Sequence, residues 1–357
     1  LFLPALRDDE PGSRLSNLEY APVAEIMGRV HWASEAFNCN APDSGNIELL
    51  HLFASAKQRQ EWLVPLLEGE IRSCFAMSEP DVASSDATNI QTTIRRDGDE
   101  YVVNGRKWFI TGVTHPNCRL IIVLGRLEGE GGDPHRRHSM LLVPMDTPGI
   151  ELVRNIPIMH YHSPEGHGEL VFRQVRVPVG NMLGEEGAGF AMAQARLGPG
   201  RIHHCMRSIG QCEVALELMR ERALERRSFG KYLYEHANIA DWIAHSRLEI
   251  DQARLLVLQA AWQIDRNGGE AARTAVSAIK VVTAQLQTRV LDRAMQIFGA
   301  MGLSPDTPLS YLWTWGRALR LLDGPDEVHL RMVARSELAK AREERGSTAA
   351  YFPLPPA

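Results

Sequence analysis

Residues 75–86 read Phe-Ala-Met-Ser-Glu-Pro-Asp-Val-Ala-Ser-Ser-Asp, and residues 94–111 read Ile-Arg-Arg-Asp-Gly-Asp-Glu-Tyr-Val-Val-Asn-Gly-Arg-Lys-Trp-Phe-Ile-Thr. The first segment is a loop of small residues that is rich in hydroxyl groups. Because small side chains let backbone N–H groups approach a ligand closely, such loops line cofactors. The second segment predicts hairpin turns at Asp97-Gly98 and Asn104-Gly105, with strands over 101–103 and 107–111. Together the two segments indicate a binding site built on a β-domain.

Apolar residues at helical spacing precede this region. After a polar start at Arg7–Ser16, the segments Tyr20–Phe37 and Glu48–Leu67 carry apolar residues at intervals of three and four, which predicts two helices. The segment Asn38–Gly45 is rich in Asn, Asp, Pro and Gly, and it predicts the loop between them.

The period of the apolar residues changes to two from Ser73 to about Gly184, as expected for strands. The segment Glu128–His138 is polar and rich in glycine, and it predicts a solvated, mobile hairpin tip. Turns rich in Gly and Pro separate the strand candidates, which are Leu120–Leu124, Ser139–Val143, Ile150–Val153 and Glu169–Val177.

Long helices are predicted from Gly187 to about Arg345. Two seams of apolar residues at intervals of three and four lie on either side of Asn267-Gly268-Gly269, which favours antiparallel helices packed side by side. The first seam is Ile239, Ile243, Ser246, Ile250, Ala253, Val257, Ala260 and Ile264; the second is Ile279, Val282, Leu286, Val290, Ala294 and Ile297. The order predicts an α+β chain with a helical domain over 1–72, a central β-domain over 73–184, a helical bundle over 185–345 and a frayed tail over 346–357.

Composition narrows the class of protein. A chain of 357 residues that is 44% hydrophobic can bury a large core, and its net charge of −5 argues against a nucleic-acid binder. No apolar run is long enough to span a bilayer. The five cysteines form no Cys-x-x-Cys pair, which favours free thiols in a reducing compartment. The chain begins at Leu1 and not at Met, so we expect its native N-terminus and any targeting peptide to be missing.

The loop and the strand quoted first resemble the acyl-CoA dehydrogenase family. The loop Ser78-Glu79-Pro80…Ser85-Asp86 is similar to that family's Thr-Glu-Pro-(small)-Ser-Asp loop with one residue inserted, and residues 104–111 are similar to its Asn-Gly-x-Lys-x-Trp-Ile-Thr strand. The resemblance implies an N-terminal helical domain, a central β-barrel or sandwich and a C-terminal four-helix bundle. It also implies that FAD is the cofactor and that the flavin ring is lined by Phe75, Met77, Ser78, Phe109, Ile110 and Thr111. Thr111 would sit at flavin N5, and Ser85 would face the thioester arm of the substrate.

Two further segments resemble the part of the family that binds the ADP half of FAD. Residues 225–231, Glu-Arg-Arg-Ser-Phe-Gly-Lys, are by themselves a basic helix end closed by Gly230. They resemble the family's Arg-x-(Thr/Ser)-Phe-Gly segment, and residues 296–300 resemble its Gln-x-x-Gly-Gly segment, with Ala300 in place of the second Gly. The resemblance implies that the FAD of a neighbouring subunit is bound by Arg226, Ser228, Phe229, Gln296 and Gly299, and hence a homodimer at least and a pair of dimers by preference.

Residues 317–329, Arg-Ala-Leu-Arg-Leu-Leu-Asp-Gly-Pro-Asp-Glu-Val-His, predict that one helix ends at Asp323-Gly324-Pro325 and that the next begins within 325–327. Taken alone this is a helix break followed by acidic residues. It resembles the family's segment that carries the catalytic base, with Asp323 where most members have Glu. The resemblance implies substrate contacts at Arg201 and Gly324 and cofactor contacts at Pro325 and Glu327.

An Asp in place of Glu at this position resembles one subgroup of the family, whose animal members are fused to an aminoglycoside-phosphotransferase-like domain. That subgroup also shows a Leu-Gly-Pro-Gly-Arg-Ile-His-His run like residues 197–204. Its resemblance makes 4-hydroxyacyl-CoA esters worth testing. Gly198 stands where many family members carry an acid, which weakens the carry-over of their substrate contacts.

The function implied is α,β-dehydrogenation of an acyl-CoA in fatty-acid or related catabolism, with an electron-transferring flavoprotein as acceptor. In the family the thioester oxygen is held by the backbone N–H of the base, here Asp323, and by a ribityl hydroxyl of FAD. The alternatives are an acyl-CoA oxidase, a nitroalkane-oxidase-like enzyme, and a catalytically silent flavin-binding assembly protein. We expect a cytoplasmic location in a bacterium, and the mitochondrial matrix or peroxisome in a eukaryote.

Other motifs carry no function. His160, His162 and His167 lack a Cys or Asp to complete a ligand set, so no metal is predicted. The segment Gly184–Gly189 does not match the dinucleotide fingerprint and lies outside any βαβ unit, so neither a Rossmann site nor a P-loop is predicted.

Overall fold

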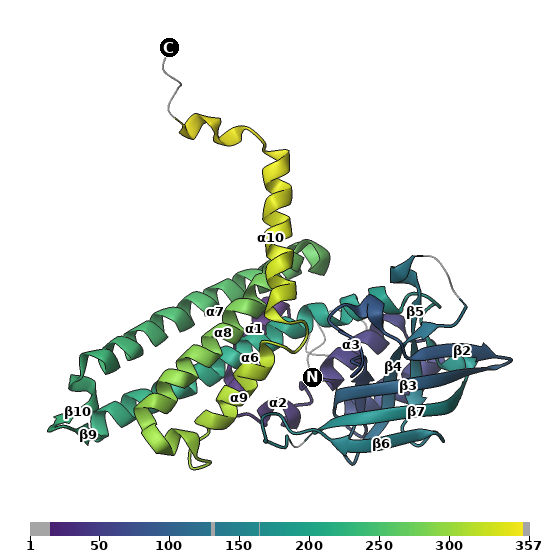
Figure 1. The fold of residues 1–357 in the computed structure, drawn as a ribbon, viewed down its shortest axis with the longest axis horizontal. Helices are drawn as coiled ribbons and strands as arrows, with labels where there is room; N and C mark the ends of the chain where they lie inside the picture. Colours follow the sequence, from purple (N-terminus) through teal and green to yellow (C-terminus); the bar gives the residue numbers. More distant parts are fainter. Residues whose placement is uncertain (1–14, 130–132, 164, 353–357) are drawn as a thin grey trace.

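The computed structural model describes residues 15–129, 133–163 and 165–352. A sheet lies at one end of the long axis and a bundle of helices at the other, and one helix, α10 (Asp326–Glu343), rises away from both (Figure 1). This arrangement confirms the predicted α+β architecture. Three predicted segments lie partly outside the described residues: Arg7–Ser16, Glu128–His138 and the tail. The parts that lie outside are residues 7–14, 130–132 and 353–357.

The central part of the chain forms an 8-stranded sheet in the order β6-β7-β3-β2-β4-β5-β8, with β1 paired to β4. A short parallel contact between β2 and β4 joins its two halves. The strands are β1 (Arg72–Ala76), β2 (Thr93–Asp97), β3 (Glu100–Thr111), β4 (Cys118–Leu127), β5 (His138–Pro144), β6 (Ile150–Asn155), β7 (His167–Pro178) and β8 (Met182–Leu183). The four strand candidates over 120–177 are therefore confirmed, each slightly longer than predicted.

The strand β4 packs against a core on each of its faces. Ile121 and Val123 point into an inner core shared with β3 and β7. Leu120, Ile122 and Leu124 point the other way, against α3 (Asp43–Phe53) and α5 (Val64–Glu68). An uninterrupted apolar run is the expected sequence of a strand that is buried on both faces.

One predicted turn is wrong. Asp97-Gly98 does join β2 to β3, but Asn104-Gly105 lies within β3, which continues to Thr111. The register of β3 against β7 shifts between Val103 and Gly105, so the dipeptide forms a β-bulge and not the predicted turn. A Cβ at Gly105 would lie 2.3 Å from Thr92 Oγ1, and the glycine is therefore needed for close approach.

The N-terminal helices are shorter than predicted. In place of one helix over 20–37, α1 (Asn17–Gly28) ends at a glycine, a poor helix former, and the four-residue α2 (Ala33–Ala36) follows it. The predicted helix over 48–67 is divided because Ser55 begins a new helix with a capping box to Gln58. Its parts are the end of α3, α4 (Ala56–Gln58), a π-helical turn (Arg59–Leu63) and α5.

The C-terminal bundle consists of α6 (Gly189–Glu225), α7 (Ala237–Ala271), α8 (Arg273–Phe298) and α9 (Leu309–Leu319). The first predicted seam lies on the inner face of α7, and Gly268 breaks the helix axis with a φ of 80°. The second seam is right except at Val282, which is 36% exposed, because Thr283 takes the inward position. The helix α1 belongs to the same core through Tyr20, Ala24 and Met27.

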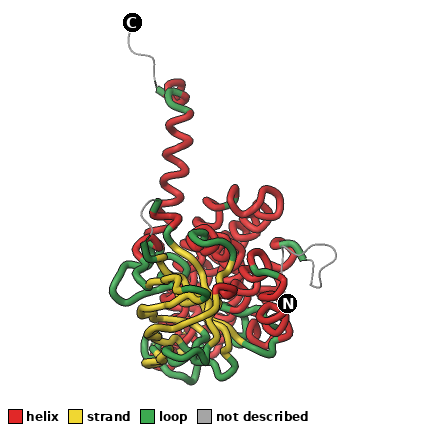
Figure 2. Tube along the Cα trace, turned by 90° about the vertical axis from the view of Figure 1, so that its right-hand side faces the viewer, coloured by secondary structure: helices red, strands yellow, loops and turns green. Residues whose placement is uncertain are grey.

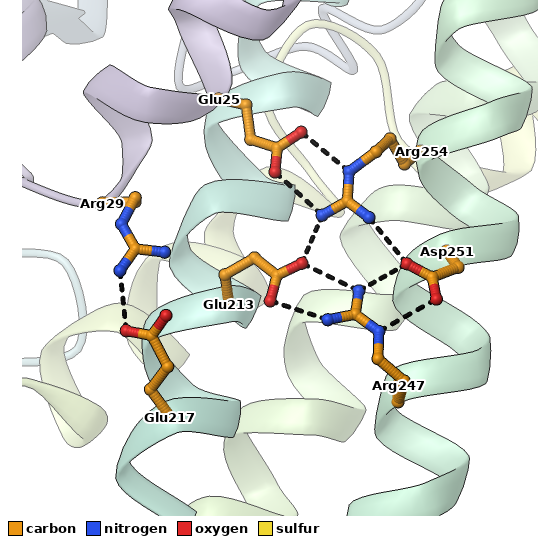
Figure 3. A network of polar contacts seen from close by, with 7 residues as sticks. All are labelled: Glu25, Arg29, Glu213, Glu217, Arg247, Asp251 and Arg254. Carbon is orange, nitrogen blue, oxygen red and sulfur yellow. Dashed lines mark hydrogen bonds and ion pairs between the residues drawn. The ribbon is translucent and has the colours of Figure 1, made fainter.

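A network of charged side chains ties α1 to the bundle (Figure 3). Arg254 of α7 donates to both carboxylate oxygens of Glu25 at 2.8 and 2.9 Å and also contacts Glu213 of α6. Arg247 donates to Glu213 at 2.8 and 2.9 Å, and both arginines contact Asp251. The carboxylate of Glu213 is therefore shared by two guanidinium groups.

The helix α10 has few neighbours in the chain. Only Asp326 and His329, in its first turns, are buried, and the rest of the helix extends from the body (Figures 1 and 2). Within the described residues, no helix is long and apolar enough to cross a membrane. All five cysteines are buried and free, as predicted.

Candidate active site

The loop after β1 is anchored by a buried ion pair. Lys107 Nζ donates to Glu79 Oε1 at 2.9 Å and to the Met77 carbonyl at 2.8 Å, and the Lys107 residue is 0% exposed. Burial lowers the pKa of Lys107 to about 8, although the carboxylate of Glu79 opposes that shift. The free-energy cost of burying the Lys107 ammonium group in the sheet is thereby offset by its two hydrogen-bond partners.

The Glu79 carboxylate also holds the far end of the loop. It accepts the backbone N–H groups of Gln91 and Thr92, both at 2.8 Å. Burial alone would raise the pKa of Glu79, but Lys107 and these donors lower it. Because the Trp108 N–H also donates to the Ser78 carbonyl at 3.0 Å, the loop lies fixed along β3.

A second bulge in β3 orients the residues predicted to face the flavin. The register against β7 shifts between Lys107 and Ile110, and Phe109 has a φ of 50°. Phe109 is 41% exposed, whereas the Ile110 side chain lies in the inner core of the sheet, so only its backbone could face a ligand. Thr111 is half-buried, and its Oγ1 lies 3.0 Å from His167 Nδ1.

His167 connects β3 to the helical bundle. Burial lowers its pKa to about 4, so the ring is neutral at pH 7. Its ring lies 5.7 Å from that of Trp315 on α9, in an edge-to-face arrangement. The helix α9 leads into the turn that carries Asp323. The same helix therefore contacts the β-domain and positions that turn.

The turn between α9 and α10 has two consecutive residues in the left-handed region, Asp323 with φ 50° and Gly324 with φ 99°. For aspartate this conformation is uncommon, and it indicates that the surrounding structure holds it. A Cβ at Gly324 would lie 2.9 Å from His329 Nε2, so glycine is required both for its dihedral angle and for space.

Side chains from three helices hold the carbonyl groups of this turn. Arg201 of α6 donates to the Asp323 carbonyl at 3.1 Å, and His329 Nε2 lies 3.2 Å from the same oxygen. Lys280 of α8 donates to the Leu319 carbonyl and, at 3.4 Å, to that of Gly324. The backbone of the turn is thus fixed by side chains of α6, α8 and α10.

The environment of Asp323 is strongly basic. Burial lowers the pKa values of Arg201 and Lys280, and Asp323 partly offsets both shifts. Burial, followed by the charge of Arg201, lowers the pKa of His329 to about 4. The Asp323 carboxylate itself contacts a histidine, since Oδ2 lies 3.4 Å from His204 Nε2.

The two acidic residues that follow the turn are arranged differently. Asp326 is buried and accepts from Arg320 Nε at 2.7 Å and from Gln285 at 3.3 Å, so its carboxylate is fixed away from solvent. Glu327 is exposed on the outer side of α10. Asp323 is the carboxylate of this segment that is partly exposed and held by its backbone, which suits a proton acceptor.

A hollow lies at the end of the bundle farthest from the sheet, beside β9 (Arg227–Ser228) and β10 (Lys231–Tyr232) (Figure 1). It has a volume of about 400 Å³. Residues from α6 and the hairpin meet residues from the end of α8 there: Arg222, Arg226, Arg227, Ser228, Gln296, Gly299 and Ala300. The structure therefore brings together the two predicted ADP-binding segments. Phe229, at the tip of the hairpin, is 99% exposed.

The remaining predicted residues lie in three places. Phe75 and Met77 pack half-buried against the outer core of the sheet. Ser85 is exposed at the surface of the loop, and Pro325 caps α10. Residues 194–199, which include Gly198, are in α6, but their side chains are not among those described.

The sequence predictions missed the supporting residues Lys280, His204, His329 and His167. Lys280 carried a signal, because a lysine beside Ile279 on the apolar seam of α8 must find partners when buried. The three histidines carried no such signal, because their contacts form only when the chain is folded.

In the part of the chain that the structure describes, no three His, Cys, Asp or Glu side chains form a group that could bind a metal. His160 and His162 are exposed, whereas His167 is buried against Thr111.

Comparison with known proteins places these features in a family. Residues 74–175 match the family described as "Acyl-CoA dehydrogenase, middle domain", and residues 187–338 match "Acyl-CoA dehydrogenase, C-terminal domain". A relative from Mycobacterium tuberculosis, named "Probable acyl-CoA dehydrogenase FadE2", is 54% identical over 331 residues, which cover 92% of this chain and 81% of the relative.

Two further proteins extend the comparison. "Acyl-CoA dehydrogenase family member 11" of Gallus gallus is 52% identical over 340 residues, and the match spans 95% of this chain but 43% of that longer protein. A solved structure titled "Structure of a putative acyl-CoA dehydrogenase from Mycobacterium abscessus" has a TM-score of 0.91 at 54% identity, and the match covers 93% of this chain and 82% of that one.

Proposed function

The chain belongs to the acyl-CoA dehydrogenase family, and from this membership we propose that it desaturates an acyl-CoA thioester between its α and β carbons, with Asp323 as the base. Proteins of the family are FAD-dependent oxidoreductases that act on the CH–CH group of acyl-CoA. The observation that carries the assignment of the base is the turn at Asp323, whose carbonyl is held by Arg201 and His329.

The residues present fit FAD. The hollow beside β9 offers guanidinium groups and a hydroxyl, which suit a pyrophosphate, and its walls at Gln296 and Gly299 suit an adenosine. The loop 78–92 and the bulge at Phe109 present backbone groups and Thr111 beside the end of β3, which suits a flat ring. When bound, the flavin would accept the β-hydrogen as hydride.

The protein's own contribution is to orient the substrate and take its proton. The Asp323 carboxylate would accept the α-proton, and the backbone N–H of Asp323 would donate to the thioester oxygen, where negative charge develops. Lys280 and Arg201 lie beside the turn as cations and favour the ionised carboxylate before the proton is transferred.

We further propose that each complete site is formed by two subunits. The hollow that suits ADP lies beside β9, at the end of the bundle farthest from the sheet (Figure 1). The residues that suit the flavin lie at the end of β3, where the sheet meets α9. The helix α7 alone, which has 35 residues, spans about 50 Å at 1.5 Å per residue. This separation favours an arrangement in which the ADP hollow of one chain serves the FAD of a neighbour.

The substrate and the electron acceptor are proposed by class. An acyl-CoA is proposed as substrate and an electron-transferring flavoprotein as acceptor, in fatty-acid or related acyl-CoA catabolism.

Anaerobic addition of acyl-CoAs to the purified protein tests the proposal. The flavin released by denaturation should be FAD, and at least one acyl-CoA of a panel that varies in length and 4-substitution should bleach the bound flavin. Bleaching by none of them, or release of FMN, would refute the proposal. Rapid oxygen consumption after bleaching would indicate an oxidase instead.

A further inference from the structure

His204, on α6, lies between a largely enclosed arginine and the carboxylate of Asp323. Its Nδ1 is 3.0 Å from Arg207 Nη2. Its Nε2 is 3.4 Å from Asp323 Oδ2, and the two side chains are only 22% and 29% exposed. The three groups therefore form a chain of contacts that is mostly shielded from water.

The contact with Arg207 fixes the tautomer of His204. A guanidinium group has hydrogen-bond donors only, so Nδ1 of the imidazole must be the acceptor in this contact. A neutral imidazole that accepts at Nδ1 carries its proton on Nε2. The Nε2–H of His204 consequently faces Asp323 Oδ2, and an ionised carboxylate can only accept.

We propose that His204 is a positioning residue for Asp323. It donates from Nε2 to Oδ2, limits rotation of the carboxylate and keeps the accepting oxygen in one direction. The inference rests on the proposed function, in which Asp323 removes the α-proton.

The same contacts exclude His204 as a second base. Its Nδ1 lone pair is occupied by Arg207, and its Nε2 already carries a proton. It can therefore orient Asp323 but cannot relay the proton onward while Arg207 is in place. Arg207 also donates through Nη1 to the Cys39 carbonyl at 3.4 Å, so its position does not depend on His204 alone.

Substitutions at position 204 separate the donor from the bulk of the side chain. His204→Leu removes both contacts. His204→Gln keeps an acceptor for Arg207 and an N–H donor for Asp323, whereas His204→Asn is too short to reach both. The exposed His245 of α7 offers a matched control as His245→Leu.

Anaerobic stopped-flow reduction of the flavin is the measurement. With saturating acyl-CoA, the reduction rate should fall about 10- to 100-fold in His204→Leu, the range expected for a lost hydrogen bond to a charged group. The dissociation constant of the acyl-CoA should change by less than about twofold, since only the orientation of the base is altered. His204→Gln should stay within about fivefold of the wild type, and His245→Leu should match the wild type.

A double-mutant cycle shows whether His204 acts through Asp323. In the Asp323→Asn background, adding His204→Leu should slow the remaining reduction by less than about twofold, because the group that His204 orients no longer accepts a proton. Independent, additive losses would overturn the proposal, as would wild-type rates in His204→Leu.

The outcomes also separate this inference from the proposed function. If no acyl-CoA bleaches the wild type, the proposed function fails. If the wild type is bleached and the cycle is additive, only the role of His204 fails. Should His204→Leu not retain flavin, the Gln and Asn variants decide: a fast Gln variant and a slow Asn variant are expected, and equal rates in the two would overturn the proposal.

Discussion

At the scale of single residues, the site depends on polar side chains that are buried and neutral. His167 lies against Thr111 at one edge of the site, and His329 supports the Asp323 carbonyl at the other. Burial lowers the pKa of each ring from 6.5 to about 4, so neither carries a charge at neutral pH. A carbonyl oxygen can only accept, so His329 must donate to Asp323 through its Nε2–H.

These two histidines predict how stability varies with pH. The unfolded chain takes up protons at their ordinary pKa of 6.5, but the folded chain does so only near pH 4. The contribution of these two neutral rings to the free energy of unfolding is therefore fully present above about pH 6.5. It is lost as the pH falls from 6.5 toward 4, by up to about 1.4 kcal/mol per pH unit for each histidine. Melting of the flavin-loaded protein at pH 7, 6 and 5 checks this.

The fall in melting temperature should be smaller in His167→Gln, which has no ring to protonate. His162→Gln, at an exposed histidine, is the control and should follow the wild type. Equal melting temperatures at pH 7 and pH 5 would contradict the assignment of neutral, buried rings.

At the scale of elements, α1 is held to the bundle through Glu213. This carboxylate of α6 lies between Arg247 and Arg254 of α7, and Arg254 reaches on to Glu25 of α1 (Figure 3). The side chain of Glu213 is 15% exposed, so the network is better shielded than an ordinary surface pair.

Replacement of Glu213 by Gln should lower the free energy of unfolding by about 1–3 kcal/mol, because two guanidinium groups lose their shared counter-charge. Chemical denaturation monitored by circular dichroism measures this. The pair Lys340–Glu337 on α10 is the control, since both side chains are at least 60% exposed and Glu337→Gln should change nothing measurable. Equal stability of both variants and the wild type would show that the network contributes little.

The elements also show what the sequence could predict. Local signals located the strands β4 and β7, the break at Gly268 and the helix end before Asp323. They misplaced a turn at Asn104-Gly105, because pairing of β3 with β7 outweighs the turn preference of that dipeptide. Asp323 was predicted only from resemblance to a family, whereas Lys280 and His204 act across helices that are distant in sequence, so no local pattern assigns their partners.

At the scale of the whole molecule, the long helices carry exposed apolar side chains. The helix α10 rises from the body (Figure 2). Its residues Leu330 and Leu338 are at least half exposed. On α7, Leu255 is 67% exposed and Trp262 is 46% exposed. Exposed apolar side chains grouped on long helices favour association between chains, in agreement with the proposal that each site is shared by two subunits.

Complementation between two inactive variants tests that proposal. Arg226→Ala removes a predicted contact to the ADP half of FAD, and Asp323→Asn removes the base. If one subunit supplies the ADP hollow and its neighbour the base, a mixed dimer has one intact site. Co-expression of the two variants should then restore about a quarter of the wild-type activity by random pairing of subunits. Activity no higher than that of the separate variants would contradict shared sites.

The central claim is that Asp323 takes the α-proton, and the rate of anaerobic flavin reduction in Asp323→Asn tests it most directly. Asparagine keeps the size of the side chain and removes the proton acceptor, so the fold and the bound FAD should be retained. The rate should fall by about 10²–10⁴-fold, the usual contribution of a general base. Glu337→Gln, at an exposed acid farther along α10, should reduce at the wild-type rate. Wild-type reduction in Asp323→Asn with loss in Glu327→Gln or Asp326→Asn would contradict the account.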